Sequence, residues 1–169
     1  MTSIETIFQS LYSLLSQTEN LTNGVPNNTP AFITTGRQLP QVSAVGEAIQ
    51  PAMYILEGEE EIDEKAIALA KYEIKCAAVV FFRNPQQTAG TGTWASIQMN
   101  ALRDAVIYQL QQRTLLADGV TVVPLPGGLR QTLGGVVYHA RVKGRLLKNE
   151  GLQNQQGALA FPISILSGM

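Results

Sequence analysis

The sequence predicts a single α+β domain in which a mostly antiparallel β-sheet is covered by an N-terminal helix and a central helix. Two stretches, at the N-terminus and past the middle of the chain, repeat apolar side chains at helical spacing. Residues 67–83 instead alternate apolar and charged side chains, which is typical of a strand. The length of 169 residues fits one domain, 1–169, and a hydrophobic content of 45% is enough for a core.

The first helix is expected over residues 3–18, because its apolar residues recur at helical spacing on one face: Ile4, Ile7, Phe8, Leu11, Leu14 and Leu15. Thr2 and Glu5 fit a capping box at its start. Residues 19–50 are expected to be a long loop region with short strands. Turn-forming asparagine, glycine and proline residues predict a loop over 19–31, and residues 32–35 a short strand.

In the middle of the chain, strands are expected at 52–56 and 67–83, with an acidic loop between them. Tyr72, Ile74 and Cys76 alternate with charged neighbours, so they should face the core. Cys76 is the single cysteine and cannot form an internal disulfide. Its apolar surroundings predict a small buried residue rather than a reactive thiol.

The second helix is expected over residues 94–112, where an apolar stripe predicts a helix lying flat on a sheet: Met99, Leu102, Val106 and Leu110. Strands should follow at 120–123, 133–147 and 158–166. Alternation along 133–147 predicts one core face, with Tyr138 and Ala140, and one basic face. Pro162 predicts that the last strand lies at a sheet edge or contains a bulge, because proline cannot donate to the ladder.

Two blocks of opposite charge lie behind a net charge of only −1. Six of the thirteen acids form the candidate acidic interface loop: Glu57, Glu59, Glu60, Glu61, Asp63 and Glu64. Residues 130–148 contain five cations and no acid, and within them Arg141, Lys143 and Arg145 form a candidate basic strand facing either an interface or DNA. Separate patches of opposite sign allow head-to-tail docking of one copy on another.

Motifs for catalysis or cofactor binding are missing from the sequence, so we expect neither an enzyme nor a cofactor or metal. His139 is the one histidine, and a surface residue is a better interpretation than a catalytic base. The stretch 90–93 lacks the lysine of a phosphate-binding loop. The acids of 57–64 lack the ligand spacing of a calcium-binding loop.

Membrane insertion and secretion are also not indicated by the sequence. No apolar run reaches the roughly 18 to 20 residues that cross a bilayer. The N-terminus has no basic segment followed by an apolar one, as a secretory signal would. We therefore expect a protein that is kept in a cytoplasm-like compartment or is assembled into a particle there.

The order of these elements resembles the tail terminator (tail-completion) proteins of long-tailed bacteriophages. The segments that carry the resemblance are residues 2–11 of the first helix, 72–81 of the long strand, 102–106 of the second helix, and 160–165 near the C-terminus. The resemblance implies a structural virion protein of the tail or neck, assembled in the host cytoplasm. It implies a hexameric ring that caps the tail tube, ends its polymerisation and provides the head-joining surface.

The partners that the resemblance implies are the tail tube protein and head–tail connector proteins, with DNA passing transiently through the ring. Two alternatives stay open on the sequence. One is another connector or neck ring of the same particle. The other is a nucleic-acid-binding domain that uses Arg141, Lys143 and Arg145, which would stand about 6 to 7 Å apart along one strand face.

Overall fold

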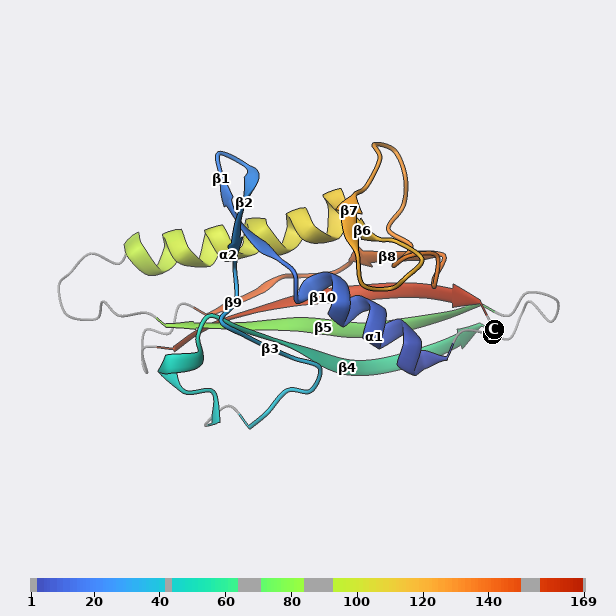
Figure 1. Ribbon diagram of the computed structural model, residues 1–169. Helices are drawn as coiled ribbons and strands as arrows, with labels where there is room; N and C mark the ends of the chain where they lie inside the picture. Colours follow the sequence, from blue (N-terminus) through green and yellow to red (C-terminus); the bar gives the residue numbers. More distant parts are fainter. Residues whose placement is uncertain (1–2, 42–43, 64–70, 84–92, 150–155, 169) are drawn as a thin grey trace.

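A computed structural model describes residues 3–41, 44–63, 71–83, 93–149 and 156–168 (Figure 1). Two helices, α1 (Ile4–Leu15) and α2 (Thr93–Gln112), accompany a mostly antiparallel sheet, so the predicted α+β class is confirmed. The loop predicted between 83 and 93 lies mainly outside the described residues, as does most of the turn predicted before the last strand.

The main sheet runs in the order β3 (Thr34–Gly36), β4 (Ala52–Asp63), β5 (Lys71–Arg83), β10 (Gln156–Gly168) and β8 (His139–Val142). The short strand β9 (Leu147–Asn149) also pairs with β10. The β3–β4 pair is parallel, and the other pairs are antiparallel. The longest ladder joins β5 and β10 without interruption along the full length of both strands.

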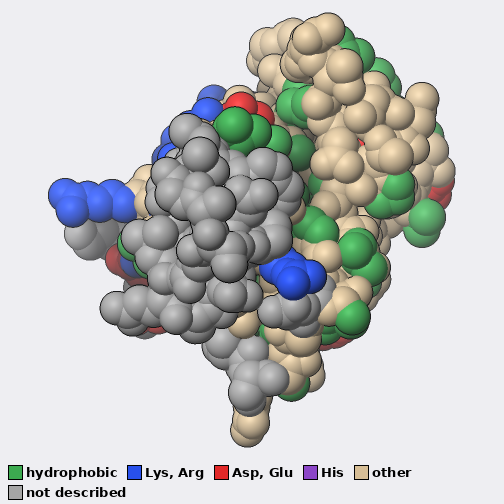
Figure 2. All heavy atoms as spheres, turned by 90° about the vertical axis from the view of Figure 1, so that its left-hand side faces the viewer, with side chains coloured by type: hydrophobic (Ala, Val, Ile, Leu, Met, Phe, Trp, Pro, Cys, Tyr) green, Lys and Arg blue, Asp and Glu red, His purple; other side chains and the backbone are tan. Residues whose placement is uncertain are grey.

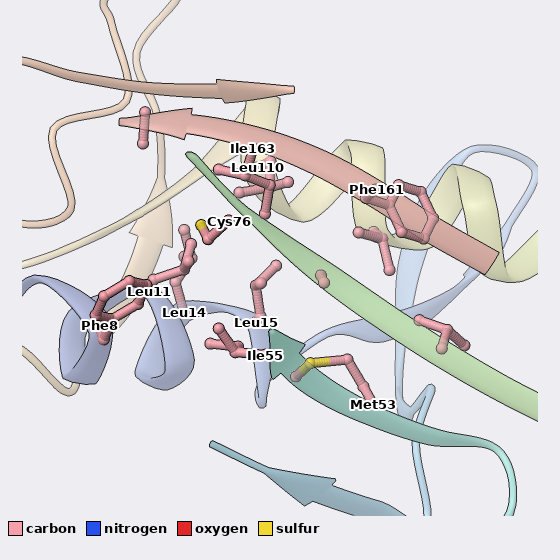
Figure 3. Packing of buried hydrophobic residues seen from close by; sticks show 14 of the residues in the cluster. Phe8, Leu11, Leu14, Leu15, Met53, Ile55, Cys76, Leu110, Phe161 and Ile163 are labelled. Atoms are coloured by element: carbon pink, nitrogen blue, oxygen red, sulfur yellow. The ribbon is translucent and has the colours of Figure 1, made fainter. Parts of the chain in front are cut away.

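Both helices cover the same face of this sheet, and the main core lies between them and the strands (Figure 1). The predicted alternation of β5 is confirmed, since Tyr72, Ile74 and Cys76 are buried in this core. The apolar faces of both helices are buried there as well. Figure 3 shows Leu11 and Leu15 of α1 pointing toward side chains of β4, β5 and β10.

The start of α1 differs from the predicted capping box. Ser3 is the N-cap, and its Oγ accepts a hydrogen bond from the Thr6 N–H at 3.1 Å. Thr2, the predicted cap, lies outside the described residues. A serine followed by Glu5 in the first turn satisfies the same rules as the pair that we expected, so the sequence could not separate the two.

Residues 19–31, predicted to be a loop, mostly form a hairpin of β1 (Glu19–Thr22) and β2 (Val25–Pro30). The hairpin rises past α2 in Figure 1. Its two-residue turn is Asn23-Gly24, both with positive φ, which is the strongest short hairpin signal in a sequence. The hairpin was predicted as a loop because its two strands are mostly polar and lack the alternating apolar residues that normally accompany such a turn. The rest of 19–50 contains β3 and a 3₁₀ turn at Glu47–Ile49.

The long strand predicted at 133–147 is also wrong. Only β8 and β9 form there, and residues 133–135 all have positive φ, which strands do not adopt. Tyr138, predicted to face the core, is 51% exposed, whereas Val137 is buried. Before this region, β6 (Arg113–Leu115) and β7 (Val122–Pro124) form a separate small sheet, close to the strand predicted at 120–123.

Strand β10 is central rather than at an edge, which corrects the expectation drawn from Pro162. The Lys143 N–H donates to the Pro162 carbonyl at 2.9 Å, so the Pro162 nitrogen faces the same side of β10. On that side the pairing stops with β8 and resumes with β9, and Gly144 between them lies against the proline ring. The missing N–H therefore falls in a gap of the ladder.

The buried position of Cys76 leads to a prediction about its reactivity. Burial, and then the nearby Glu57, together raise the pKa of the Cys76 thiol to about 12. Because the thiolate is the reactive species, iodoacetamide at mildly alkaline pH should label the folded protein far more slowly than the urea-unfolded chain. Mass spectrometry of timed samples measures both rates, and equal rates would contradict the buried position.

Candidate functional site

The predicted acidic interface loop is not a loop, because β4 continues through it to Asp63. Strand β3 pairs with β4 only up to Tyr54, so within the described residues the rest of β4 has no strand on its outer side. A bulge at Gly58 and Glu59 shifts the register within this half. Charged side chains and bulges are common on exposed sheet edges, where they oppose uncontrolled pairing. Glu64 lies outside the described residues.

Two of the acids on β4 are matched within the chain. Arg37 contacts both Glu57, at 2.9 Å, and Glu5 of α1. Lys75 of β5 pairs with Glu61 at 3.1 Å. Glu59 and Glu60 are exposed and form no ion pair with any residue that the structure describes. These two carboxylates are therefore available to a partner.

The three cations predicted to share one strand face are separated. Arg141 lies in β8, while Lys143 and Arg145 follow in the connection to β9. The Lys143 Nζ donates to the Glu73 Oε1 at 2.8 Å, and the Ser164 hydroxyl donates to the same oxygen at 2.5 Å. Arg141 and Arg145 are exposed and make no ion pair within the described part of the chain.

The partner of Lys143, Glu73, has its pKa held below the usual range, first by the Lys143 hydrogen bond and then by the one from Ser164. Its contribution to stability is therefore present above the pKa of the unfolded chain and is lost as the pH falls through the folded value. Both side chains are partly exposed, so this contribution is small. The consequence for the site is that Lys143 is already neutralised, which leaves Arg141 and Arg145.

The sheet face opposite the helices connects the two charged edges. At one end it is covered by the segment leading into β4, where Val45 and Tyr54 pack with Phe81. The remainder carries the Glu61–Lys75 and Glu73–Lys143 pairs and the half-exposed Leu56. In the end-on view of Figure 2, most of the visible Lys and Arg side chains lie along one margin of this face, and one lies near its centre.

The surface formed by the described residues has several cavities. A cavity of about 480 Å³ lies between the β1–β2 hairpin and α2, lined by residues such as Leu21, Ile107 and Tyr108. Its one acid, Asp104, pairs with Arg103. Within the described ranges, no three histidine, cysteine or acidic side chains are grouped as a metal site would require. A second cavity, of about 260 Å³, lies beside β8 and includes His139.

The sequence analysis did not single out Arg37 or Glu73 as part of the charged surface, and it counted Arg130 in the basic block without including it in the candidate basic strand. Glu73 could have been found, because the alternation of β5 places it beside Lys75 on the face away from the core. Arg37 and Arg130 lie outside regular strands, and only the folded chain shows what they face.

Comparisons with known proteins assign no family. The chain matches no protein-family model, and a search of curated proteins found no similar sequence. None of the helices in the described ranges has the length and apolar character needed to cross a bilayer.

Proposed function

We propose that this protein is a structural subunit that docks on copies of itself to form a ring, and that it acts as a tail terminator of a long-tailed bacteriophage. The observation that carries the self-docking is that one sheet has an acidic edge at β4 and a basic edge at β8. Unlike edges on opposite sides of a subunit favour heterologous contacts, which continue from copy to copy. The proposed ring is hexameric, as the sequence resemblance implies.

In this proposal the ring caps the tail tube, ends its polymerisation and offers a surface to the head–tail connector proteins. DNA passes through it, and the chain carries out no catalysis and needs no cofactor. The virion neck is its place in the particle, after assembly in the host cytoplasm. The tail-specific part is supported by the resemblance of the element order, whereas the self-docking is supported by the charged edges.

The two alternatives differ from this proposal in where the protein binds. A nucleic-acid-binding role for Arg141, Lys143 and Arg145 is less favoured, because Lys143 is engaged with Glu73 and the three cations do not share one strand. Another neck ring would use the same edges but would contact the portal side instead of the tube end.

Particles that contain this chain can be labelled with a gold-conjugated antibody against it and viewed by electron microscopy. We expect gold at the head-proximal end of the tail tube, and isolated tails should retain it. Gold on tail-less heads alone would favour the connector alternative. Gold along the whole tail, or none on the particles, would contradict the proposed function.

A further inference from the structure

The cavity of about 260 Å³ beside β8 is rich in positive charge. It is lined by Arg130, His139 and Arg141, together with neutral residues of α2 and of the 125–131 segment. Like Arg141, Arg130 is exposed and forms no ion pair within the described residues. Two arginines without an acidic partner around one small cavity are suited to an oxyanion such as a carboxylate.

Gln131 fixes the position of this cavity. Its buried side chain donates from Nε2 to the Leu110 and Arg113 carbonyls at 3.2 and 2.5 Å, and its Oε1 accepts from the Leu133 N–H at 3.0 Å. Its own carbonyl accepts the Ala140 N–H at 2.8 Å. The segment bearing Arg130 is therefore held against β8, and the cavity exists before any ligand arrives. Because the outward-facing N–H of Ala140 already donates to Gln131, it cannot pair with a strand of another copy. A partner would therefore bind at this position through side chains.

The charge of His139 depends on what enters the cavity. Burial lowers the pKa of His139, and then Arg141 and Arg130 lower it further. The groups facing it are these two arginines and the neutral Leu110, Gln111 and Leu166. An added carboxylate would therefore raise the pKa of His139 from its lowered value.

The register of the sheet places the acidic and basic edges at the same level along the strands. One cross-strand row runs Glu61, Glu73, Leu166, His139, and the next runs Glu60, Ile74, Ile165, Ala140. A contact between the two edges thus adds no shift along the strands from one copy to the next. Heterologous contacts close into a ring when the rotation between copies also closes, and the absence of a shift along the strands meets one condition for that.

We propose that the cavity formed by Arg130, His139 and Arg141 receives the carboxylates of Glu59 and Glu60 from a second copy of this chain. This inference rests on the proposed function, and it identifies the contact that builds the ring. The charges are opposite, and these two acids and two arginines form no ion pair within the described part of their own chain. A net charge of −1 favours this occupant over a DNA phosphate.

Docking should depend on pH through His139. A carboxylate in the cavity favours the protonated imidazole, so the affinity between copies rises as the pH falls through the pKa of His139.

Charge reversal in the full-length chain tests this contact. Arg141→Glu alone, or Glu59→Lys with Glu60→Lys, should weaken self-association at least about tenfold. Mixing the two variants should restore hetero-assembly between them, and light scattering after size exclusion measures the mass. Arg103→Glu is the matched control, since Arg103 lies on α2 and does not line the cavity. It makes the same charge change and should leave the mass unchanged. Circular dichroism confirms that each variant is folded.

NMR titration of the single histidine gives a second readout. The pKa of His139 should be higher in the assembled protein than in the Glu59→Lys, Glu60→Lys variant. If rings persist in both charge-reversed variants and the His139 pKa is unchanged, the proposed contact at the cavity is wrong, while the ring proposal stands. A chain that is monomeric at every concentration would overturn both. A His139 shift caused by a DNA duplex but not by assembly would assign the cavity to phosphate instead.

Discussion

Replacing Phe161 with alanine is expected to lower the free energy of unfolding by about 3 to 5 kcal/mol. Phe161 lies in the central strand β10, is 0% exposed and points into the core shared by the sheet and both helices (Figure 3). The surrounding ladder with β5 runs uninterrupted through this position, so the backbone has little freedom to collapse into the cavity that the missing ring leaves.

Urea denaturation followed by circular dichroism measures this loss, with an unchanged slope as the sign of an intact two-state transition. Val25→Ala serves as the control, because Val25 lies at 62% exposure in the β1–β2 hairpin and should change stability by no more than ~0.5 kcal/mol. If both substitutions had equal effects, the core would not be where the structure places it.

Gly58→Ala is expected to have the second largest effect, a loss of about 1 to 3 kcal/mol together with weaker self-association. A Cβ at this position would lie 2.3 Å from the Lys75 carbonyl oxygen, closer than atoms can approach. The Cβ is fixed rigidly to the β4 backbone and the oxygen belongs to the β5 backbone. The clash can therefore be removed only if β4 moves away from β5 at the bulge. That movement would displace the neighbouring Glu59 and Glu60, which the proposed contact uses.

The matched control is Gly46→Ala, where an added Cβ meets nothing within 4 Å. Its stability should stay within ~0.5 kcal/mol of the parent protein. Thermal unfolding gives the stability change, and light scattering gives the change in assembly. A Gly58→Ala protein with parental stability would show that β4 does not pack against β5 as described.

Local patterns in the sequence predicted the helices and the inner strands well. The apolar stripe of α1 and the alternation of Tyr72, Ile74 and Cys76 are local signals, and both were confirmed. Strand order could not be predicted in the same way. Pro162 suggested an edge strand, but the gap that accommodates it arises from the separation of β8 and β9, which no local pattern shows.

The charged surface could be predicted only in part. The two blocks of opposite charge are evident in the sequence, yet the acids were placed in a loop because glutamates and glycine have low strand propensity. Pairing with β5 overrides that propensity as far as Asp63. The glycines at 134 and 135 bend the chain at the start of the expected long basic strand. Arg141 and Arg145 are separated further on, where β8 ends at Val142 and Gly144 follows with a positive φ. Arg130 lies beside β8 because the carbonyl of its neighbour Gln131 accepts the Ala140 N–H.

The molar mass of the full-length protein in solution tests the central claim most directly, namely that this chain works by docking on copies of itself. Light scattering at increasing concentration and low ionic strength should show a closed oligomer that high salt weakens, because the contact is charge-matched. A protein that remains a single chain across the whole concentration range, at low and high salt alike, would contradict the account.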